Sequence, residues 1–338
     1  MIDEIVVIGR PGLVGGADTE LFDQIKVWLK MGLKCRIIPT SEPRYPINYS
    51  HPNLVIEEIG RYVACYNKHV ISYCNQFFLR DIEVIRRYAK TISWVNCMCF
   101  NFKKEITAHK NGLIDFFLYQ TKHQYYKCAV NLLKVNSDYT AIPIIPYFDG
   151  SSFPFHDHSD DIKYGRISRC SCDKFSKDQF KIYKTAIQNR NIKGIVLGWS
   201  KEFEIFYNDP NQLYLKNNNM IDFLEQGSIS AQDFYKQCGI VCMSADSFEN
   251  LPRITFESMS SGSVLIVDNR GGWKDLIDHT HTGFLCDNKE DFIKYLQYMI
   301  DNPDIRMNIA KNARQYLEAK YSYEVSASRW KEFFKILT

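Results

Sequence analysis

Short β-branched runs that alternate with amphipathic segments constrain the fold of this chain more than any other feature. The first apolar run, at 5–8, ends at Gly9 and leads into a glycine-containing loop. From Leu21 the apolar residues recur at helical spacing until Gly32, and 34–39 then reads as a second strand. This order of strand, glycine loop, helix and strand predicts a βαβ unit at the start of the chain.

The same alternation continues through the rest of the sequence and predicts mostly parallel sheets covered by helices. The further expected strands are 69–74, 91–100, 113–120 and 141–148, then, after a break, 162–168, 192–199, 239–244 and 263–268. The break is a polar segment at 148–161, which has the composition of an inter-domain linker.

A chain of 338 residues is long enough for two medium-sized domains. We expect one α/β domain over 1–150 and a second over 151–320. The amphipathic segment at 321–338 is expected to form a helix that packs back toward the first domain. Ligands of such sheets bind beyond the carboxyl ends of the strands, so the expected site is a cleft between the two domains.

The charge balance argues against a nucleic-acid partner. The formal net charge is only +3, from 42 basic and 39 acidic residues, whereas a nucleic-acid-binding domain is usually more basic. The N-terminus does not resemble a signal peptide, and no window approaches the roughly 20 apolar residues of a membrane span. We therefore expect a cytoplasmic protein with at most peripheral membrane contact. Lys103, Lys104 and Lys110 are read either as a solvated helix face or as a basic patch facing a membrane or acceptor.

The cysteines do not form a metal-binding or disulfide pattern. There are 11 of them, without a CxxC motif; the closest pairs are Cys97 with Cys99 and Cys170 with Cys172. On a strand, that spacing places both thiols of a pair on one face. We interpret these residues as small apolar side chains in a reducing compartment. Two HxH pairs lie in polar stretches without enough further ligands, so no metal site is expected.

Two features of the sequence suit phosphate binding. Gly15 and Gly16 lie between the first strand and the first helix, where backbone N–H groups and the helix dipole favour an anion. Arg166, Arg169 and Lys174 follow the first strand of the second half and together have the charge to clamp a diphosphate. Each feature also has a simpler interpretation, as a tight turn and as a solvated basic loop.

A pair of glutamates completes the candidate site. Glu249 ends the loop after the strand at 239–244, and Glu257 lies eight residues further on, within the next predicted helix. Two carboxylates placed in this way can accept hydrogen bonds from the hydroxyls of two different sugars. The spacing alone is common by chance, so its weight comes from the strand before it and the strand after it.

At this point the chain resembles a known family. The stretch 244–268 resembles the E-x7-E region of retaining glycosyltransferases of family GT4, which have the GT-B fold, with Glu249 and Glu257 on the two glutamates. Other segments resemble the family in the same order, including its phosphate-binding G-R…K stretch and the glycine turn after the glutamates: 142–153, 164–178 and 271–285.

The resemblance implies two Rossmann-like α/β domains whose parallel sheets face each other across a deep cleft. It implies metal-independent transfer of a sugar, with retention, from a nucleotide-diphosphate donor that is UDP- or GDP-linked, without a cofactor. The first domain would be the acceptor side and the second the donor side. The acceptor would be a hydroxyl of a glycan, a lipid-linked sugar or another molecule.

The resemblance also implies roles for individual residues. Arg166 and Lys174 would hold the diphosphate and stabilise the charge that develops on it, with Arg169 able to replace one of them. Glu249 would lie beside the donor sugar, and Glu257 would bind the ribose hydroxyls.

Backbone groups would complete the donor site. The N–H groups of Asn250 and Leu251 would contact sugar or phosphate, and Gly15 and Gly16 would face the phosphates or the acceptor. The chain departs from the family at Pro252, which cannot donate a hydrogen bond, and at a histidine that many members carry in the first domain. These departures keep two alternatives open: a catalytically silent nucleotide-sugar-binding protein, and another GT-B enzyme such as a nucleotide-sugar epimerase or a phosphorylase.

Overall fold

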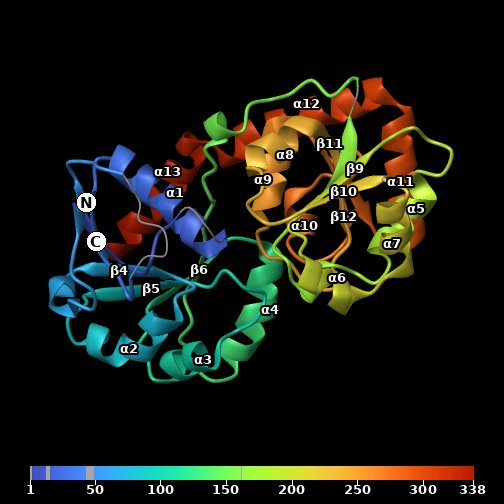
Figure 1. The fold of residues 1–338 in the computed structure, drawn as a ribbon. Helices are drawn as coiled ribbons and strands as arrows, with labels where there is room; N and C mark the ends of the chain where they lie inside the picture. The colour runs from blue at the N-terminus through green and yellow to red at the C-terminus, as the bar shows by residue number, and fades with distance from the viewer. Residues whose placement is uncertain (1, 13–15, 43–48, 161) are drawn as a thin grey trace. The chain divides into compact units, whose positions relative to one another are not determined.

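The computed structural model describes residues 2–12, 16–42, 49–160 and 162–338. The chain divides into two compact units (Figure 1). Unit 1 comprises Met1–Asp149 with Tyr321–Thr338, and unit 2 comprises Gly150–Lys320. Within the described ranges, no helix is both long and apolar enough to cross a membrane.

Unit 1 is built on a seven-stranded parallel sheet in the order β3-β2-β1-β4-β5-β6-β7. Its strands are β1 Glu4–Ile8, β2 Lys34–Ile38, β3 Leu54–Ile56, β4 His69–Tyr73, β5 Thr91–Val95, β6 Phe116–Tyr119 and β7 Ala141–Pro143. Its α-helices are α1 Gly16–Lys30, α2 Gln76–Arg86, α3 Lys103–Lys110, α4 Lys122–Leu133 and α13 Tyr323–Leu337.

The central strand β1 is buried on both faces, which explains its continuous β-branched run. Because side chains alternate along a strand, Ile5 and Val7 join the core under α1 and α13, whereas Val6 and Ile8 join the core under the helices α2, α3 and α4. Each face of the sheet therefore has its own apolar cluster.

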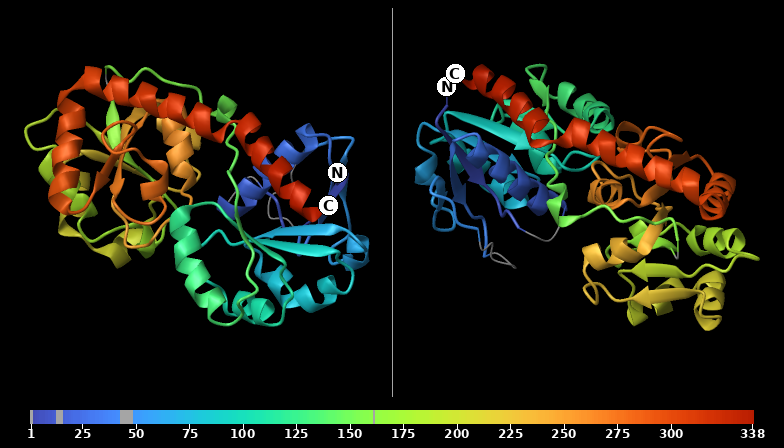
Figure 2. Two further views of the ribbon diagram at one scale, coloured as in Figure 1. Left: turned by 180° about the vertical axis from the view of Figure 1, so that it is seen from behind. Right: turned by 90° about the horizontal axis from the view of Figure 1, so that it is seen from above.

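The C-terminal helix α13 packs beside α1 in unit 1 (Figure 2). The Trp28 and Trp330 rings meet edge to face with centroids 4.9 Å apart. The indole Nε1 of Trp330 donates to Oε1 of the buried Gln24 at 2.6 Å, so the polar atom of this large side chain is satisfied. The amphipathic pattern of the last residues is thus accounted for by burial against the first helix.

Unit 2 contains a six-stranded parallel sheet in the order β10-β9-β8-β11-β12-β13. Its strands are β8 Lys163–Ile167, β9 Gly194–Leu197, β10 Ile221–Leu224, β11 Cys238–Met243, β12 Val264–Asp268 and β13 Phe284–Cys286. Its α-helices are α5 Gln179–Ala186, α6 Lys201–Tyr207, α7 Pro210–Asn217, α8 Ala231–Gln237, α9 Arg253–Ser261, α10 Trp273–Leu276, α11 Lys289–Asp301 and α12 Pro303–Tyr321, whose last residue belongs to unit 1.

Some local expectations from the sequence were wrong. The strand expected over 91–100 stops at Val95, so Cys97 and Cys99 follow the strand instead of sharing a face of it. Strand β10 was not anticipated because it carries Asp222 in its middle. That carboxylate is stabilised by Lys193, at 2.8 Å, which the local sequence pattern does not indicate.

Each sheet reverses its strand order at one point. In unit 1 the order reverses between β1 and β4, and in unit 2 between β8 and β11. The loops that leave neighbouring strands diverge there, and ligands of doubly wound sheets bind in the resulting crevice beyond the carboxyl ends. These two switch points are where functional side chains are expected.

Candidate functional site

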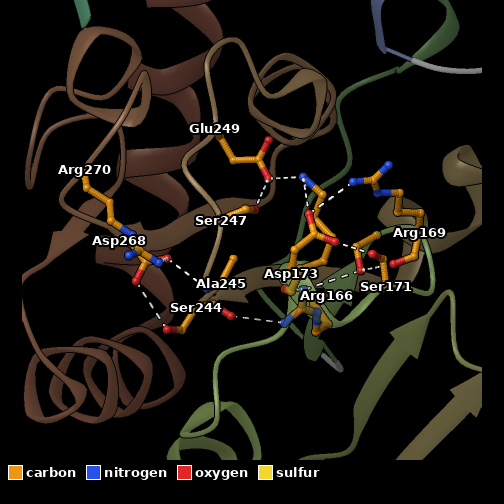
Figure 3. Close-up of polar contacts among 12 residues, drawn as sticks. Arg166, Arg169, Ser171, Asp173, Ser244, Ala245, Ser247, Glu249, Asp268 and Arg270 are labelled. Carbon is orange, nitrogen blue, oxygen red and sulfur yellow. Dashed lines mark hydrogen bonds and ion pairs between the residues drawn. The ribbon is translucent and has the colours of Figure 1, made fainter. Parts of the chain in front are cut away.

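At the switch point of unit 2, an ion pair joins the loop after β8 to the loop after β11. The ammonium Nζ of Lys174 lies 2.5 Å from Oε1 of Glu249. The Ser247 hydroxyl is 3.4 Å from the same oxygen (Figure 3). The two side chains are only 18% and 21% exposed. Residues 75 positions apart in the sequence are thereby brought together at the carboxyl edge of the sheet.

Backbone hydrogen bonds hold these two loops against each other. The Ser247 N–H donates to the Asp173 carbonyl at 2.9 Å, and the Ser176 N–H donates to the Ser244 carbonyl at 3.0 Å. Lys174 itself lies in a short 3-10 helix over Cys172–Lys174. The position of its ammonium group is therefore set by the backbone of both loops.

Arg166 lies behind the ion pair and is completely buried. Its guanidinium donates to Gln179 Oε1 at 2.7 Å, to the Ser244 carbonyl at 3.4 Å, and to the Lys174 carbonyl. Its Cζ also lies 3.7 Å from the centroid of the Phe175 ring. Burial lowers the pKa of Arg166 to about 10, which leaves it charged at neutral pH. In this arrangement its contacts fix the carbonyls of both loops, and no part of it faces solvent.

Arg169 is more exposed and pairs within its own loop. Its side chain is 64% exposed and lies 3.1 Å from the carboxylate of Asp173. Partial burial would raise the pKa of Asp173, but hydrogen bonds from Ser171 and Arg169 lower it overall. Asp173 also lies 3.9 Å from Lys174, so the loop carries both signs of charge close together.

Glu257 lies on α9 with two polar neighbours. The hydroxyl of the buried Tyr235 donates to its Oε2 at 3.1 Å, and Arg253 Nε lies 3.9 Å from its Oε1. Before this helix, Asn250 is 5% exposed and Leu251 is partly buried. The glutamates therefore come from two different elements, a loop and a helix.

Sequence reasoning assigned no role to the glycine turn that supports the Glu249 loop. The Gly272 N–H donates to the Glu249 carbonyl at 2.7 Å, and a Cβ at Gly272 would lie 1.5 Å from the Asn250 carbonyl oxygen. Gly271 has a φ of +60°, which disfavours any other residue. The two backbones pack directly on each other, and the double glycine after a predicted strand was the signal for this.

Asp268 is a second supporting residue that the sequence reasoning missed. It ends β12, and its carboxylate accepts from the Ala245 N–H at 2.9 Å and from the Ser244 hydroxyl at 3.3 Å. Burial raises the pKa of Asp268. The signal was an acidic residue at the carboxyl end of the strand that neighbours β11.

The glycine loop of unit 1 is only partly described. Gly15 lies outside the described residues. Gly16 is the exposed first residue of α1, and a Cβ added there would meet nothing within 4 Å. In the part of the chain that the structure describes, no three or more His, Cys, Asp or Glu side chains are grouped so as to hold a metal ion.

A model of a known protein family matches part of this chain. Residues 170–316 match the model of the family described as glycosyl transferases group 1. An uncharacterized glycosyltransferase of Haemophilus influenzae is 31% identical over 101 residues. That similarity spans 29% of this chain and 28% of the length of the relative.

Solved structures resemble the chain over nearly its whole length. The Anabaena protein Alr3699/HepE, solved in complex with UDP, matches 98% of this chain and 99% of its own, with a TM-score of 0.79 and 14% identity. Sucrose-phosphate synthase from Thermosynechococcus elongatus matches 99% of each chain, with a TM-score of 0.76 and 14% identity. The expected α/β fold of the GT-B type, with two parallel sheets, is thereby confirmed.

Proposed function

We propose that this chain, whose residues 170–316 match the model of the glycosyl transferases group 1 family, transfers a sugar from a nucleoside-diphosphate-sugar donor to a hydroxyl group. The ion pair of Lys174 with Glu249 at the switch point of unit 2 is the observation that carries the proposal. In such a donor, the cation would bind the diphosphate and the carboxylate would lie beside the positively polarised sugar.

The reaction that we propose retains the anomeric configuration and uses no metal. The bond between C1 and the diphosphate oxygen breaks, and its electron pair leaves with the diphosphate. The acceptor oxygen bonds to C1 on the face that the diphosphate leaves, and the hydroxyl proton passes to the departing diphosphate. The ammonium of Lys174 would stabilise the charge that grows on the diphosphate, in the place where a metal ion acts in other transferases.

Lys174 and Glu249 would exchange partners when the donor binds. In the structure each neutralises the other at 2.5 Å. A diphosphate that takes over the ammonium releases the carboxylate of Glu249 to face the sugar, where it can accept a hydroxyl proton or stabilise positive charge at C1. The site therefore needs no unpaired buried charge before the donor arrives.

We assign Arg166 to positioning, with its guanidinium holding the Lys174 carbonyl, and leave direct contact with the diphosphate to Lys174. Arg169 is exposed and is available as a second phosphate contact. Glu257 would bind the ribose hydroxyls, as the family resemblance implies. The backbone N–H groups of Asn250 and Leu251 would contact sugar or phosphate.

The remaining assignments concern the base of the donor, the glycine loop and the acceptor. The UDP bound by the Anabaena protein supports uridine as the donor base ahead of guanosine. Gly15 and Gly16 would approach the donor phosphates or the acceptor through their backbone. A glycan or a lipid-linked sugar is the acceptor class that we propose.

A thermal-shift titration with UDP, GDP and UDP-glucose tests the donor site. At a concentration of about 100 times Kd, a nucleotide that binds should stabilise the protein by roughly 2.7 kcal/mol. We expect Glu249→Gln to keep nucleotide binding and lose turnover of the sugar nucleotide. Absence of stabilisation by every nucleotide would overturn the proposal. Binding without turnover in the wild-type protein, with any acceptor, would indicate a silent binding protein.

A further inference from the structure

Unit 1 has an open cavity of about 460 Å³ at its own switch point. It is lined by residues that follow the carboxyl ends of three adjacent strands: Arg10 after β1, Thr40 and Ser41 after β2, and Cys74 after β4. This is the crevice in which a doubly wound sheet holds its ligand.

The charges that line the cavity are not balanced. Arg10, Arg80 and Lys104 contribute three cations, against the single carboxylate of Asp18. Arg10 Nη2 lies 3.8 Å from Asp18, beyond hydrogen-bonding distance. Lys104 is farther from any carboxylate that the structure describes: its charge contributes to the lowered pKa of Asp81, but less than the charge of Arg80 does. Only the charge of Arg80 is closely matched, by Asp81 at 2.7 Å.

The first turn of α2 opens into the same cavity. Asn75 caps this helix, accepting from the Phe78 N–H at 2.9 Å, while its Nδ2 donates to the Thr40 hydroxyl at 2.9 Å. Gln76 and Phe77 follow it along the cavity wall, and N–H groups of a first helical turn have no partner within the helix. They add donors and a positive dipole end to the cationic side chains.

Two aromatic residues give the cavity features that suit a sugar. Phe77 is 45% exposed and belongs to the lining, with Arg80 Cζ 5.0 Å from the centroid of its ring. Tyr73 also belongs to the lining and is 2% exposed, and its hydroxyl has no hydrogen-bond partner among the described residues. This hydroxyl is itself out of contact with solvent, so Tyr73 belongs to the wall of the cavity and Phe77 supplies the surface that a sugar can contact.

From this combination we infer that the unit 1 cavity binds a sugar or polyol that carries an anionic group, a phosphate or a carboxylate, and that this molecule is the acceptor. The anionic group lies by Lys104 and Arg10, and the hydroxyl-bearing part lies by Asn75 and the Phe77 ring. The cavity as a binding site stands on its own geometry, whereas its identification as the acceptor site rests on the proposed function.

Calorimetric titration with matched probes tests the inference. The probes are glucose 6-phosphate, glucuronate and inorganic phosphate, with uncharged glucose as the reference. We expect the anionic sugars to bind at least about tenfold more tightly than glucose, because a charged acceptor strengthens each hydrogen bond from a cation. Phosphatidylcholine vesicles with and without phosphatidylinositol form a separate arm, which shows whether the anionic sugar is free or is a lipid headgroup.

The Lys104→Gln variant should lose most of this preference, by about tenfold, while Lys110→Gln should bind as the wild type does. Lys110 lies on the same helix, α3, and is not part of the cavity lining, so it controls for a general loss of surface charge. Equal binding of glucose and the charged sugars overturns the inference. So does the absence of binding by all soluble probes and vesicles, or an equal effect of the two variants.

The UDP titration of the same proteins separates this inference from the proposed function. Stabilisation by UDP in Lys104→Gln shows that the variant is folded and that its donor site is intact. If UDP binds the wild-type protein and no anionic probe does, only the inference about unit 1 fails. If the probes bind and no nucleotide does, the proposed transferase function fails and the anion site stands as a binding site.

Discussion

The two units share the same sheet architecture but treat the charges at their switch points differently. In unit 2, between β8 and β11, Lys174 and Glu249 neutralise each other at 2.5 Å. In unit 1, between β1 and β4, Arg10 and Asp18 are 3.8 Å apart, and the cavity lining holds three cations, Lys104 among them, against the one carboxylate of Asp18.

This difference indicates two ways to prepare a binding site. A closed ion pair suits a ligand that brings its own anion and replaces one partner, as a nucleotide diphosphate would replace Glu249. An open cationic cavity suits a ligand that supplies the missing negative charge. Each of the following substitutions compares a residue of one unit with its counterpart in the other, or separates the partners within one unit.

The largest effect on stability is expected for Arg166→Gln. Several buried acceptors, including the Lys174 carbonyl, lose a charged donor, so the free energy of unfolding should fall by about 3–5 kcal/mol. Arg10→Gln in unit 1 should cost less than about 1 kcal/mol, since that side chain is 33% exposed. Urea unfolding measures both. Wild-type stability of Arg166→Gln combined with lost UDP binding would assign Arg166 to the diphosphate directly.

Of the substitutions in this comparison, Lys174→Gln should have the largest effect on the reaction. We expect turnover of the sugar nucleotide to fall by about 10²–10³-fold, the effect of removing one preorganised donor to a developing charge. Stability should fall by about 1–3 kcal/mol, because the mostly buried carboxylate of Glu249 loses its charged partner. Steady-state kinetics with Arg169→Gln as the matched control measure this. Equal losses in both variants would show that Arg169 shares the phosphate contact.

Gly272→Ala compares the glycine turn of unit 2 with the glycine loop of unit 1. The new methyl group would lie 1.5 Å from the Asn250 carbonyl oxygen, so we expect a loss of about 1–3 kcal/mol in stability, together with weaker UDP binding. Gly16→Ala meets open space at the start of α1 and should be neutral or stabilising by up to about 1 kcal/mol. Thermal unfolding of the two variants measures the change in stability that each alanine causes. A tolerated alanine at 272 would show that the Glu249 loop moves freely.

Asp18→Asn should have the smallest effect of these substitutions, and that effect is on ligand binding in the unit 1 cavity. Removing the one carboxylate of the cavity should tighten glucuronate binding by up to about fivefold, the effect of one partly solvated charge pair. Burial raises the pKa of Asp18, with Arg10 opposing that change. A carboxyl whose pKa is raised by folding takes up its proton first in the folded protein, so its contribution to stability grows as the pH falls through the folded pKa and is complete below the unfolded pKa.

The wild-type protein should therefore approach the glucuronate affinity of Asp18→Asn as the pH is lowered, and the variant itself should lack this pH dependence. Calorimetric titrations at two pH values measure the difference. An affinity that stays the same in wild type and variant at both pH values would place the bound anion away from Asp18.

The sequence was a good guide wherever local pattern and structure coincide. The β-branched run of β1 and the amphipathic pattern of α13 predicted elements that are present in the structure. The positions of Glu249 and Glu257, one in a loop and one in a helix, also followed from the pattern, because strand and helix boundaries are set by local spacing and by glycine and proline.

The sequence was a poor guide wherever a residue depends on distant partners. The sequence favours Arg166 as a diphosphate ligand, with a solvated basic loop as the alternative, whereas in the structure its side chain is buried against Gln179 and the Ser244 carbonyl, the latter 78 residues away. Strand β10 was missed because the ion pair that tolerates Asp222 comes from Lys193 on a neighbouring segment. The periodicity of apolar residues predicts which face of an element is buried, but it does not predict which loop covers that face.

The amino-acid sequence by itself determined two alternating α/β units and the order of their chemical groups, because alternation and glycine placement act over a few residues. Only the tertiary structure decided that Lys174 closes on Glu249, that Arg166 lies inside the unit, and that the cations of unit 1 surround an open cavity. Burial and charge pairing are properties of side chains that meet from separate loops, and those meetings are set by the strand order of each sheet.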